Sequence, residues 1–477
     1  MSQAVLHFTE KPESEARNGA EDQLIVPFVL LLAASALVLL APLPVAALGA
    51  ILFVAVAIRA PMPALCLVVV SLPFLLPRHI GREEFTPTEL AIVLCTMAGL
   101  LRVASLVWRT QLKIGWRNAV DRAYHLARER SGDLTVTVLV LLVVVAAAIS
   151  LTVSVELRES LRSFRTIIVE PIAFYFLAVL QARRRRDAYL LACALVVVGV
   201  LISLVGLWQY ATDERIITAE AGLRRIRGFY GSPNNLGLFL GRAVPMAVGL
   251  ALWWKRGRTL LVAAALLMTV AVILTFSFGA WLAIPSALVV IAALRGKAVL
   301  RVTIYIGSVG LVLLAIAAIK IPRIGSHFDL RWGTSFARIE LWKSSLRMVA
   351  TSPIRGIGLD NFLYYYQHGY RLPGAWQELD LSHPHNIILD FWLSLGLPGL
   401  ILLGCLGARF VELIVGQWER STATERGVYA GVVGAMVDTL VHGLVDNSFF
   451  LPDLAVLFWL MFAIVGVLQN ARDRRTT

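Results

Sequence analysis

The sequence has 477 residues, of which 58% are hydrophobic, and its mean hydropathy of +0.75 lies far above that of a water-soluble fold of this length. These values exclude a soluble enzyme with a membrane tail. The formal net charge is +13, but in a polytopic membrane chain the distribution of charge matters more than its sum. The net charge therefore does not indicate nucleic-acid binding, and we expect no nucleic-acid partner. The four cysteines stand singly in apolar runs without CxxC spacing, which indicates neither a disulfide framework nor a zinc site.

Apolar stretches bounded by charged residues, proline or glycine follow one another along the chain, and each is a candidate transmembrane helix. The predicted spans are 24–41, 44–58, 61–77, 88–107, 134–154, 166–181, 188–212, 235–254, 259–276, 278–294, 300–319, 386–408, 427–446 and 452–469. The first three are short and separated by prolines, so two of them could form one hairpin. The sequence therefore predicts an all-α integral membrane protein, a polytopic bundle of about 12–14 transmembrane helices with one large extracytoplasmic loop.

Lysine and arginine concentrate on one side of this predicted bundle. If the N-terminus is cytoplasmic, that side is the inside, which the positive-inside rule favours for a multi-pass protein of the cytoplasmic (inner) membrane. The predicted regions are a cytoplasmic N-terminal tail (1–23), helices 1–11 (24–319) with a basic cytoplasmic segment (102–130), a large periplasmic or extracytoplasmic loop (320–385), helices 12–14 (386–469) and a cytoplasmic C-terminal tail (470–477). Trp108, Trp116 and Tyr124 interleave with the basic residues of the cytoplasmic segment and predict an interfacial helix that binds membrane lipids.

Two exterior segments are unusually basic for the outer side, and the first of them contains the string GLRRIRGFYGSPNNLG. Its arginines, Arg224, Arg225 and Arg227, precede a turn that leads into a helix, and both guanidinium groups and helix N-termini favour anions. Asn234 and Asn235 are expected to cap that helix while offering amide contacts to a ligand. The alternative is a positive loop anchored to lipid phosphates.

The second basic exterior segment lies within the 320–385 loop. Ile339, Trp342, Leu346 and Val349 recur there at helical spacing, which predicts an amphipathic helix on the membrane surface with Arg338 off its apolar stripe. The glycine-bearing turn after Pro353 is a weak signal that indicates a bend more than a phosphate cradle.

The string SHPHN at the end of this loop places two histidines and an asparagine directly before an apolar span. His383, His385 and Asn386 therefore face the basic exterior segments, which indicates a catalytic role for a histidine. A zinc-binding HxH pair is the competing interpretation. Because no further histidine, cysteine or carboxylate stands at metal spacing in the sequence, we expect no metal site.

Ionisable residues inside predicted spans indicate function by default, and the alternative is mutual pairing or a span boundary placed a few residues wrong. Six residues qualify: Glu170, Arg242, Asp390, Asp438, His442 and Asp446. For Glu170, which precedes a proline, this alternative is the preferred interpretation. Arg242 is expected to line a cavity beneath the first basic loop, because it lies about two turns into the helix that follows that loop.

Four landmarks recur in order along the second half of the chain: RIRGFYGSPN, LTFSFGAWLA, ARIELWKSSLRMVATSPIRGIGLDNF, and HPHNIILDFWLSLGLPG with HGLVDNSFF beyond it. With the large exterior loop, they cover roughly residues 190–470, and this part of the chain resembles the O-antigen ligase/polymerase family of membrane glycosyltransferases. Two positions depart from the family pattern. Phe278 replaces an arginine of the second landmark, and Ser394 replaces a frequent glutamate of the fourth.

The resemblance implies an O-antigen ligase-like glycosyltransferase of polysaccharide (lipopolysaccharide) biosynthesis. Its donor would be a glycan on a polyprenyl diphosphate such as undecaprenyl diphosphate, and its acceptor a hydroxyl of lipid A-core or of another glycan. The reaction would take place on the outer face of the cytoplasmic membrane, without metal, nucleotide sugar or other cofactor. The resemblance implies His385 as general base, with Arg338 and Arg227 as the clamp on the diphosphate. The remaining substrate-binding candidates are Arg224, Arg225, Asn234, Asn235, Arg242, His383 and Asn386.

These residue types suit that chemistry, because guanidinium groups stabilise the charge of a departing diphosphate and a histidine can accept the proton of the attacking hydroxyl. A polymerase of lipid-linked repeat units for O-antigen, capsule or exopolysaccharide fits equally well, since it differs only in the acceptor. A membrane transporter or exporter is the alternative from another class, against which stand the lack of a visible inverted repeat and the collection of distinctive residues on one face.

Overall fold

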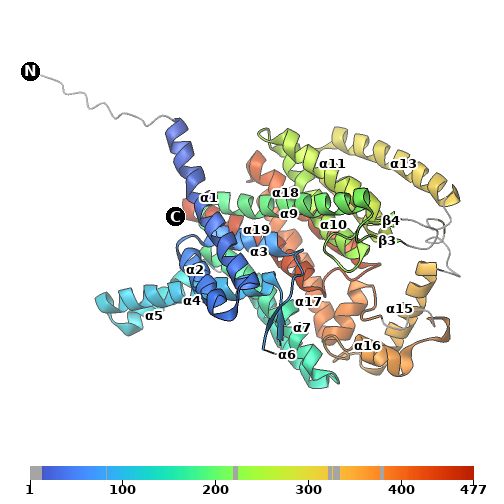
Figure 1. Ribbon diagram of the computed structural model, residues 1–477, viewed down its shortest axis with the longest axis horizontal. Helices are drawn as coiled ribbons and strands as arrows, with labels where there is room; N and C mark the ends of the chain where they lie inside the picture. Colours follow the sequence, from blue (N-terminus) through green and yellow to red (C-terminus); the bar gives the residue numbers. More distant parts are fainter. Residues whose placement is uncertain are drawn as a thin grey trace, which may run out of the picture.

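The computed structural model describes residues 13–81, 83–130, 132–218, 224–320, 325, 333–375 and 381–476, and its regular structure is almost wholly helical (Figure 1). The long helices are α1 (Glu13–Leu40), α2 (Leu43–Arg59), α3 (Pro61–Ser71), α4 (Pro87–Ile114), α5 (Trp116–Arg130), α6 (Leu134–Ser150), α8 (Glu170–Gln181), α9 (Arg185–Thr212), α10 (Pro233–Trp253), α11 (Arg258–Thr275), α12 (Phe278–Arg295), α13 (Lys297–Lys320), α15 (Gly333–Thr351), α17 (Ile387–Trp418), α18 (Ala423–Gly443) and α19 (Pro452–Thr476).

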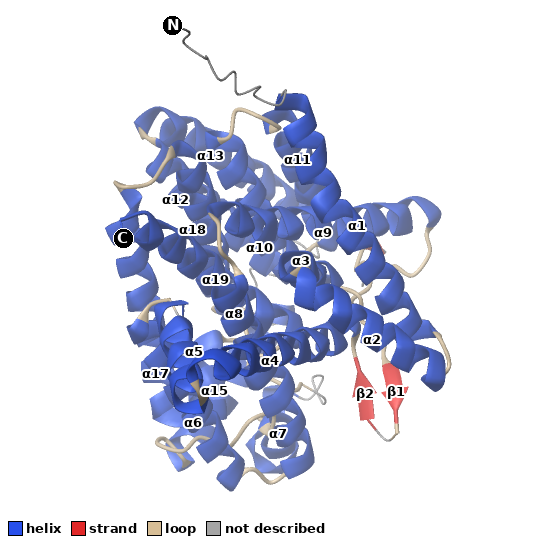
Figure 2. Cartoon of the chain, turned by 90° about the vertical axis from the view of Figure 1, so that its left-hand side faces the viewer, coloured by secondary structure: helices blue, strands red, loops and turns tan. Residues whose placement is uncertain are grey.

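Shorter elements connect these helices. They are the strands β1 (Arg78–Ile80), β2 (Glu83–Phe85), β3 (Ile217–Thr218) and β4 (Arg224–Arg225), the helices α7 (Leu157–Ser163) and α16 (Phe362–Tyr365), the 3-10 turns η1 (Leu151–Val153) and η5 (Pro373–Ala375), and the π-helical segments η2 (Phe164–Val169) and η4 (Tyr366–Tyr370). The strands pair as two small antiparallel hairpins, β1 with β2 and β3 with β4. The β1–β2 hairpin projects from the helical bundle in Figure 2.

Within the described residues, ten helical segments are long and apolar enough to cross a membrane. They are Pro87–Lys113, Leu134–Val153, Leu157–Gln181, Arg185–Thr212, Pro233–Trp253, Arg258–Thr275, Phe278–Arg295, Lys297–Lys320, Ile387–Trp418 and Pro452–Arg472. The polytopic helical membrane bundle predicted from the sequence is thereby confirmed. The other four predicted spans correspond to the shorter apolar helices α1, α2 and α3 and to α18, and their crossing of the membrane stays a prediction.

The centre of the bundle is built by α10, α18 and α19. Gly249 of α10 and Gly431 of α18 face each other so closely that a Cβ atom on Gly249 would lie 2.4 Å from the Gly431 nitrogen. Small residues at such a crossing let two helix backbones approach in a membrane, where packing rather than the hydrophobic effect drives association. At the other extreme, α13 has no buried residue and lies at the edge of the bundle (Figure 1).

Contacts between loops define two ends of the bundle. At one end Glu425, in the first turn of α18, pairs with Arg185 at 3.0 Å and with Arg472 at 2.8 Å. At the other end the loop before α10 contacts the α11–α12 junction, and the loop after α18 contacts the residue before α17. Apart from those in α10, all the predicted site residues lie at this second end of the bundle, in its loops or near the ends of its helices.

The structure corrects some predicted boundaries. Helix α1 begins at Glu13, well before the predicted span, so part of the polar tail is helical, whereas residues 1–12 lie outside the described residues. Helix α18 ends at Gly443, so the predicted span that ran to residue 446 stops earlier and Asp446 lies in the following loop. Part of the predicted 320–385 loop, residues 321–324, 326–332 and 376–380, also lies outside the description.

Candidate functional site

The loop between α18 and α19, residues 444–451, is the centre of the candidate site. Its backbone is held by Asn447, whose side-chain oxygen accepts hydrogen bonds from the backbone nitrogens of Phe449 (3.3 Å) and Phe450 (2.8 Å). The Asn447 backbone nitrogen donates in turn to Oδ1 of Asp446 at 2.9 Å. Asp446 is 4% exposed, so the loop presents a fixed and almost fully buried carboxylate.

Asp446 joins two residues that the sequence analysis assigned to catalysis. Nδ1 of His385 lies 2.7 Å from Oδ1 of Asp446, and Nη2 of Arg338 lies 3.9 Å from Oδ2. The two residues come from opposite ends of the 333–385 region, and both side chains are mostly buried. The carboxylate therefore holds an imidazole and a guanidinium group together, with the imidazole oriented through its Nδ1 atom.

The charge state of Asp446 follows from these neighbours. Burial by itself would raise the pKa of the Asp446 carboxyl, but His385, its hydrogen bond and Arg338 outweigh burial and hold the pKa well below its ordinary value. Asp446 is therefore ionised at neutral pH. An ionised carboxylate next to Nδ1 favours the tautomer in which that nitrogen carries the proton, and Nε2 of His385 is then free to accept one.

His385 has an uncommon backbone conformation. Its φ angle is +51°, in the left-handed region that non-glycine residues rarely adopt and that costs on the order of 1–3 kcal/mol. The following residue, Asn386, caps α17 by accepting hydrogen bonds from Ile388 N (3.0 Å) and Leu389 N (3.2 Å), and its Nδ2 donates to Leu444 O at 3.1 Å. Asn386, predicted to bind substrate, thus fixes the histidine to the loop that carries Asp446.

His383 lies beside His385, with their ring centroids 4.3 Å apart, and Ser382 Oγ is 3.0 Å from its Nδ1. Partial burial, together with the neighbouring His385, lowers the pKa of His383 below its ordinary value. Ligand atoms of His383, His385 and Asp446 all lie within 4.8 Å of one another. A third potential ligand, which the spacing in the sequence did not indicate, therefore lies beside the two histidines, because Asp446 is distant in sequence but adjacent in space.

Helix α15 carries Arg338 to the site, but the face that α15 buries differs from the predicted apolar stripe. The buried residues on α15 include Leu341, Ser345 and Met348, which recur at helical spacing from Arg338, whereas Leu346 of the predicted stripe is 53% exposed. Leu341 and Met348 belong to a second apolar core. Its other fully buried members are Val349, Ile357, Phe362, Tyr366, Ala375 and Leu393. Arg338 therefore extends the buried face of α15, which explains why its guanidinium group meets Asp446.

The turn after α15 fixes this helix against α17. Ile357 N donates to Leu393 O at 2.7 Å, and Leu397 N donates to Pro353 O and Ile354 O, both at 3.2 Å. These bonds form where Gly396 (φ +70°) interrupts α17. A Cβ atom at Gly396 would lie only 2.0 Å from Ile354 O, so a larger residue does not fit there. The backbone of this turn therefore supports the helix that carries the site.

The first basic loop is ordered by contacts with three helices. Gln209 of α9 donates to Gly228 O at 2.7 Å and accepts from Gly228 N at 3.0 Å. Arg225 donates to Thr275 O at the end of α11 (2.7 Å) and to Asn234 Oδ1 in α10 (2.9 Å). Gln209 is a contributor that the sequence analysis missed, because a glutamine near the end of an apolar helix gives no motif.

The remaining residues of this loop have different partners. Arg224 pairs with Asp213 at 2.9 Å, and Arg227 donates to Arg215 O at 3.0 Å and to Gly231 O at 3.5 Å. The proximity of Arg227 to Arg338 stays a prediction.

The predicted capping role of Asn234 and Asn235 is wrong. Helix α10 begins at Pro233 and Ser232 accepts the cap hydrogen bond, from Asn234 N at 3.2 Å. Asn234 instead uses its side-chain oxygen to hold Arg225.

Arg242 is 1% exposed and lies in the core of the bundle. Its Nη1 lies 3.2 Å from Asp438 Oδ2, it donates to Leu238 O, and its Nη2 donates to Ser448 O at 2.9 Å. Arg242 therefore holds the loop that carries Asp446 through its hydrogen bond to Ser448 O. Its guanidinium group, which was expected to line a cavity, is paired with Asp438 instead. The preferred interpretation of Glu170 is confirmed, since Arg165 Nε lies 3.7 Å from Glu170 Oε1.

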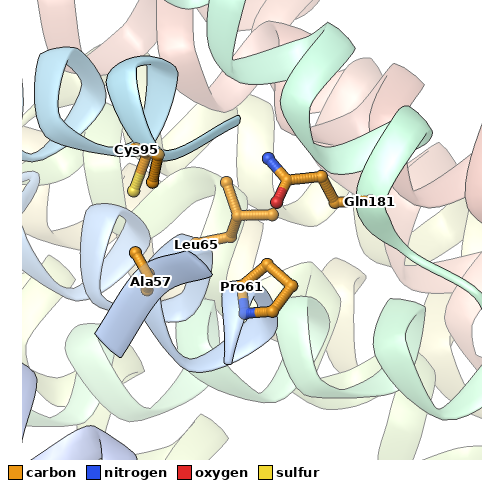
Figure 3. Close-up of a pocket in the computed structure, with 7 residues that line it drawn as sticks. Ala57, Pro61, Leu65, Cys95 and Gln181 are labelled. Atoms are coloured by element: carbon orange, nitrogen blue, oxygen red, sulfur yellow. The ribbon is translucent and has the colours of Figure 1, made fainter. Parts of the chain in front are cut away.

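Two hollows lie outside this cluster. A narrow one among α2, α3, α4 and α8, with no room for a water molecule, is lined mostly by apolar side chains and by Gln181 (Figure 3). A cavity of about 50 Å³ is lined by residues that include Glu89, Glu170 and Asp453. Tyr230 of the basic loop donates to Asp453 Oδ2 at 2.9 Å, so this cavity lies beside the basic loop, and it has room for water.

Comparison with known proteins identifies the region around these residues. Residues 263–404 match the family model described as O-antigen ligase (Wzy_C), and no curated protein matches the chain. The matched range runs from α11 to α17 and includes Arg338, His383 and His385, whereas Asp446 and the first basic loop lie outside it. The family comprises membrane glycosyltransferases of the ligase and polymerase types. Residues 263–404 of this chain thus match the O-antigen ligase domain of the Wzy_C family.

Proposed function

We propose that the protein is an O-antigen ligase-like glycosyltransferase of the cytoplasmic membrane. It transfers a glycan from a polyprenyl diphosphate carrier to a hydroxyl acceptor, lipid A-core or another glycan, on the outer face. The observation that carries this proposal is the group formed by His385, Asp446 and Arg338, which combines a base, its orienting carboxylate and a cation within hydrogen-bonding and ion-pairing distances.

In the proposed reaction the acceptor hydroxyl attacks the anomeric carbon of the glycan. The bond from that carbon to the diphosphate oxygen breaks, a glycosidic bond forms, and the polyprenyl diphosphate leaves with the bonding electron pair. The hydroxyl proton passes to Nε2 of His385, while Asp446 holds Nδ1 and stabilises the imidazolium that forms. No other reactant is needed for the balance of atoms and charge.

Arginines supply the stabilisation that the leaving group requires. A departing diphosphate gains negative charge, and guanidinium groups stabilise it by bidentate, charge-assisted hydrogen bonds. Arg338 stands at the histidine, and Arg227 is the proposed second member of the clamp, from the basic loop at the same end of the bundle. Arg224, Arg225 and Asn234 support this loop, and His383 is proposed to contact the acceptor beside the base.

The orientation of the protein in the membrane is part of the proposal. The end that carries Glu425, Arg185 and Arg472 is assigned to the cytoplasm, and the end that carries His385 to the outer side. The grouping of the site at one end of the bundle favours a transferase over a transporter, whose site is expected near the midplane.

A reconstituted assay tests the function and separates ligase from polymerase. The purified protein in lipid vesicles receives a polyprenyl diphosphate-linked glycan, and either lipid A-core or a second lipid-linked unit is offered as acceptor. A glycan joined to lipid A-core identifies a ligase, and longer lipid-linked glycans identify a polymerase. Folded protein that transfers to neither acceptor, with donors of several sugar compositions, would contradict the proposed function.

A further inference from the structure

His383, His385 and Asp446 also form a constellation that the transfer reaction does not require. Two imidazole rings and a carboxylate offer one ligand atom each, and these atoms lie within 4.8 Å of one another. We propose that they form a binding site for Zn²⁺ and that the bound ion inhibits the enzyme. The inhibitory part of this inference rests on the proposed function, whereas the binding part does not.

The ligand set has the chemistry of a zinc site. Neutral imidazole nitrogens and a carboxylate oxygen are ordinary zinc ligands, and three protein ligands leave a fourth position for water. Ligand atoms about 2.0–2.1 Å from a tetrahedral zinc ion lie about 3.3 Å from each other. The three residues therefore need only small side-chain rotations to close from 4.8 Å onto an ion.

The hydrogen bonds within the group orient its ligands. An ion that replaces the proton between Nδ1 of His385 and Oδ1 of Asp446, which lie 2.7 Å apart, is bound by both residues. Ser382 Oγ, 3.0 Å from His383 Nδ1, leaves the Nε2 atom of His383 available as the third ligand. A hydrogen bond to the second nitrogen of a metal-binding histidine is a common support for zinc, and Ser382 supplies it to His383.

Positive charge around the group limits the affinity. Arg338 Nη2 lies 3.9 Å from the second oxygen of Asp446, and Arg242 and His442 are the other basic groups within electrostatic range of this carboxylate. A divalent cation is repelled by Arg338, so the site is expected to be weaker than a structural zinc site. Removal of this guanidinium group should strengthen zinc binding, an effect opposite in sign to its effect on transfer.

Zinc at this position blocks the base directly. With zinc on Nδ1, the neutral imidazole of His385 carries its proton on Nε2, so this nitrogen cannot take the acceptor proton and the hydroxyl has no base. No bond to the glycan is broken in this state, and removal of the ion by a chelator restores the free imidazole. His383 is then a residue whose loss should release the inhibition even though transfer itself continues at a reduced rate.

Titration of Zn²⁺ into the full-length, chelator-treated protein in detergent, against a chromophoric competitor, tests the binding. The wild type should take up one equivalent, His383→Ala and Asp446→Asn should weaken the dissociation constant at least about tenfold, and Arg338→Gln should tighten it. His79→Ala is the matched control, since His79 is exposed and lies outside the group, and it should bind as the wild type does. Unchanged affinity in both His383→Ala and Asp446→Asn, confirmed as folded by size-exclusion chromatography, would overturn the site.

The transfer assay supplies the second arm. Zn²⁺ should inhibit the wild type, EDTA should reverse the inhibition, and the concentration for half-inhibition should rise at least about tenfold in His383→Ala. Active protein that neither binds nor responds to Zn²⁺ overturns this inference and leaves the proposed function intact. Protein that binds Zn²⁺ through these residues but transfers no glycan supports the site and contradicts the function, and activation by Zn²⁺ overturns the inhibitory role.

Discussion

Nδ1 of His385 lies 2.7 Å from Oδ1 of Asp446, although the two residues are 61 positions apart in the sequence. Asn386 reinforces the pair, because it begins α17 immediately after the histidine and donates to Leu444 O in the loop that carries the aspartate. The orientation of the proposed base thus depends on the loop that follows α18, although His385 itself precedes α17.

This relationship predicts a severe effect of Asp446→Asn. The amide has the shape of the carboxylate but lacks its charge, so it no longer selects the tautomer with Nε2 free or stabilises the imidazolium. We expect transfer to fall about 10²–10⁴-fold with donor binding retained. The rate of the purified variant measures this, and Asp213→Asn, which removes an exposed partner of Arg224, serves as the control. The double variant Asp446→Asn/His385→Ala should lose little beyond either single change, and fully multiplied losses would show that the two residues act independently.

Asp446 should also make stability depend on pH in one direction. Its pKa in the folded protein is below its ordinary value, despite burial, because of His385 and Arg338, so the unfolded state binds more protons. The stabilisation is complete above the ordinary carboxyl pKa of about 3.9 and is lost as the pH falls below it toward the lowered pKa. The difference in melting temperature between wild type and Asp446→Asn should therefore be constant from about pH 8 to pH 5 and shrink below about pH 4. A difference that shrinks already between pH 7 and pH 5 would contradict this assignment.

Arg338→Lys should separate charge from geometry. Lysine keeps the positive charge but lacks the planar fork that binds a diphosphate in a bidentate manner, so turnover should fall strongly while the protein still inserts and folds. Arg347→Lys on the same helix is the matched control, because Arg347 is exposed. Unchanged turnover of folded Arg338→Lys would assign the residue to lipid anchoring.

Arg227→Lys tests the proposed second member of the clamp. The same reasoning predicts a strong loss of turnover, with Arg224→Lys nearer to wild type because Arg224 is paired with Asp213. Initial rates over a range of donor concentrations measure both variants. If Arg224→Lys is the more damaging of the two, the clamp has been assigned to the wrong arginine.

The sequence predicts the helices well and the packing around the site poorly. Every predicted span has a helix in the structure, because runs of about twenty apolar residues admit little else in a membrane. The apolar stripe of α15 was misplaced because its buried face includes Ser344 and Ser345, which hydropathy counts as polar. These serines donate to the carbonyls of Glu340 and Leu341, so they are buried without cost to their hydrogen bonding.

The candidate site shows the same division. His385, Arg338 and His383 were assigned from the sequence, and all three lie around one carboxylate. Asp446 was recognised only as an ionisable residue in a predicted span. Its role as a shared partner depends on contacts between α15, α17 and the loop after α18, and such long-range contacts leave no periodicity in a single sequence.

The rate of glycan transfer by His385→Ala, measured in vesicles over a range of pH, tests the central claim most directly. Because alanine tolerates the left-handed backbone at this position poorly, His385→Asn is measured beside it to separate loss of the base from backbone strain. Both variants should lose about 10²–10⁴-fold in rate. We expect the activity of the wild type to decline on the acid side, and this decline should be absent in both variants but kept in His383→Ala, whose loss of rate should be milder. Wild-type transfer by folded His385→Asn, or loss of transfer in His383→Ala alone, would contradict the assignment of His385 as the base.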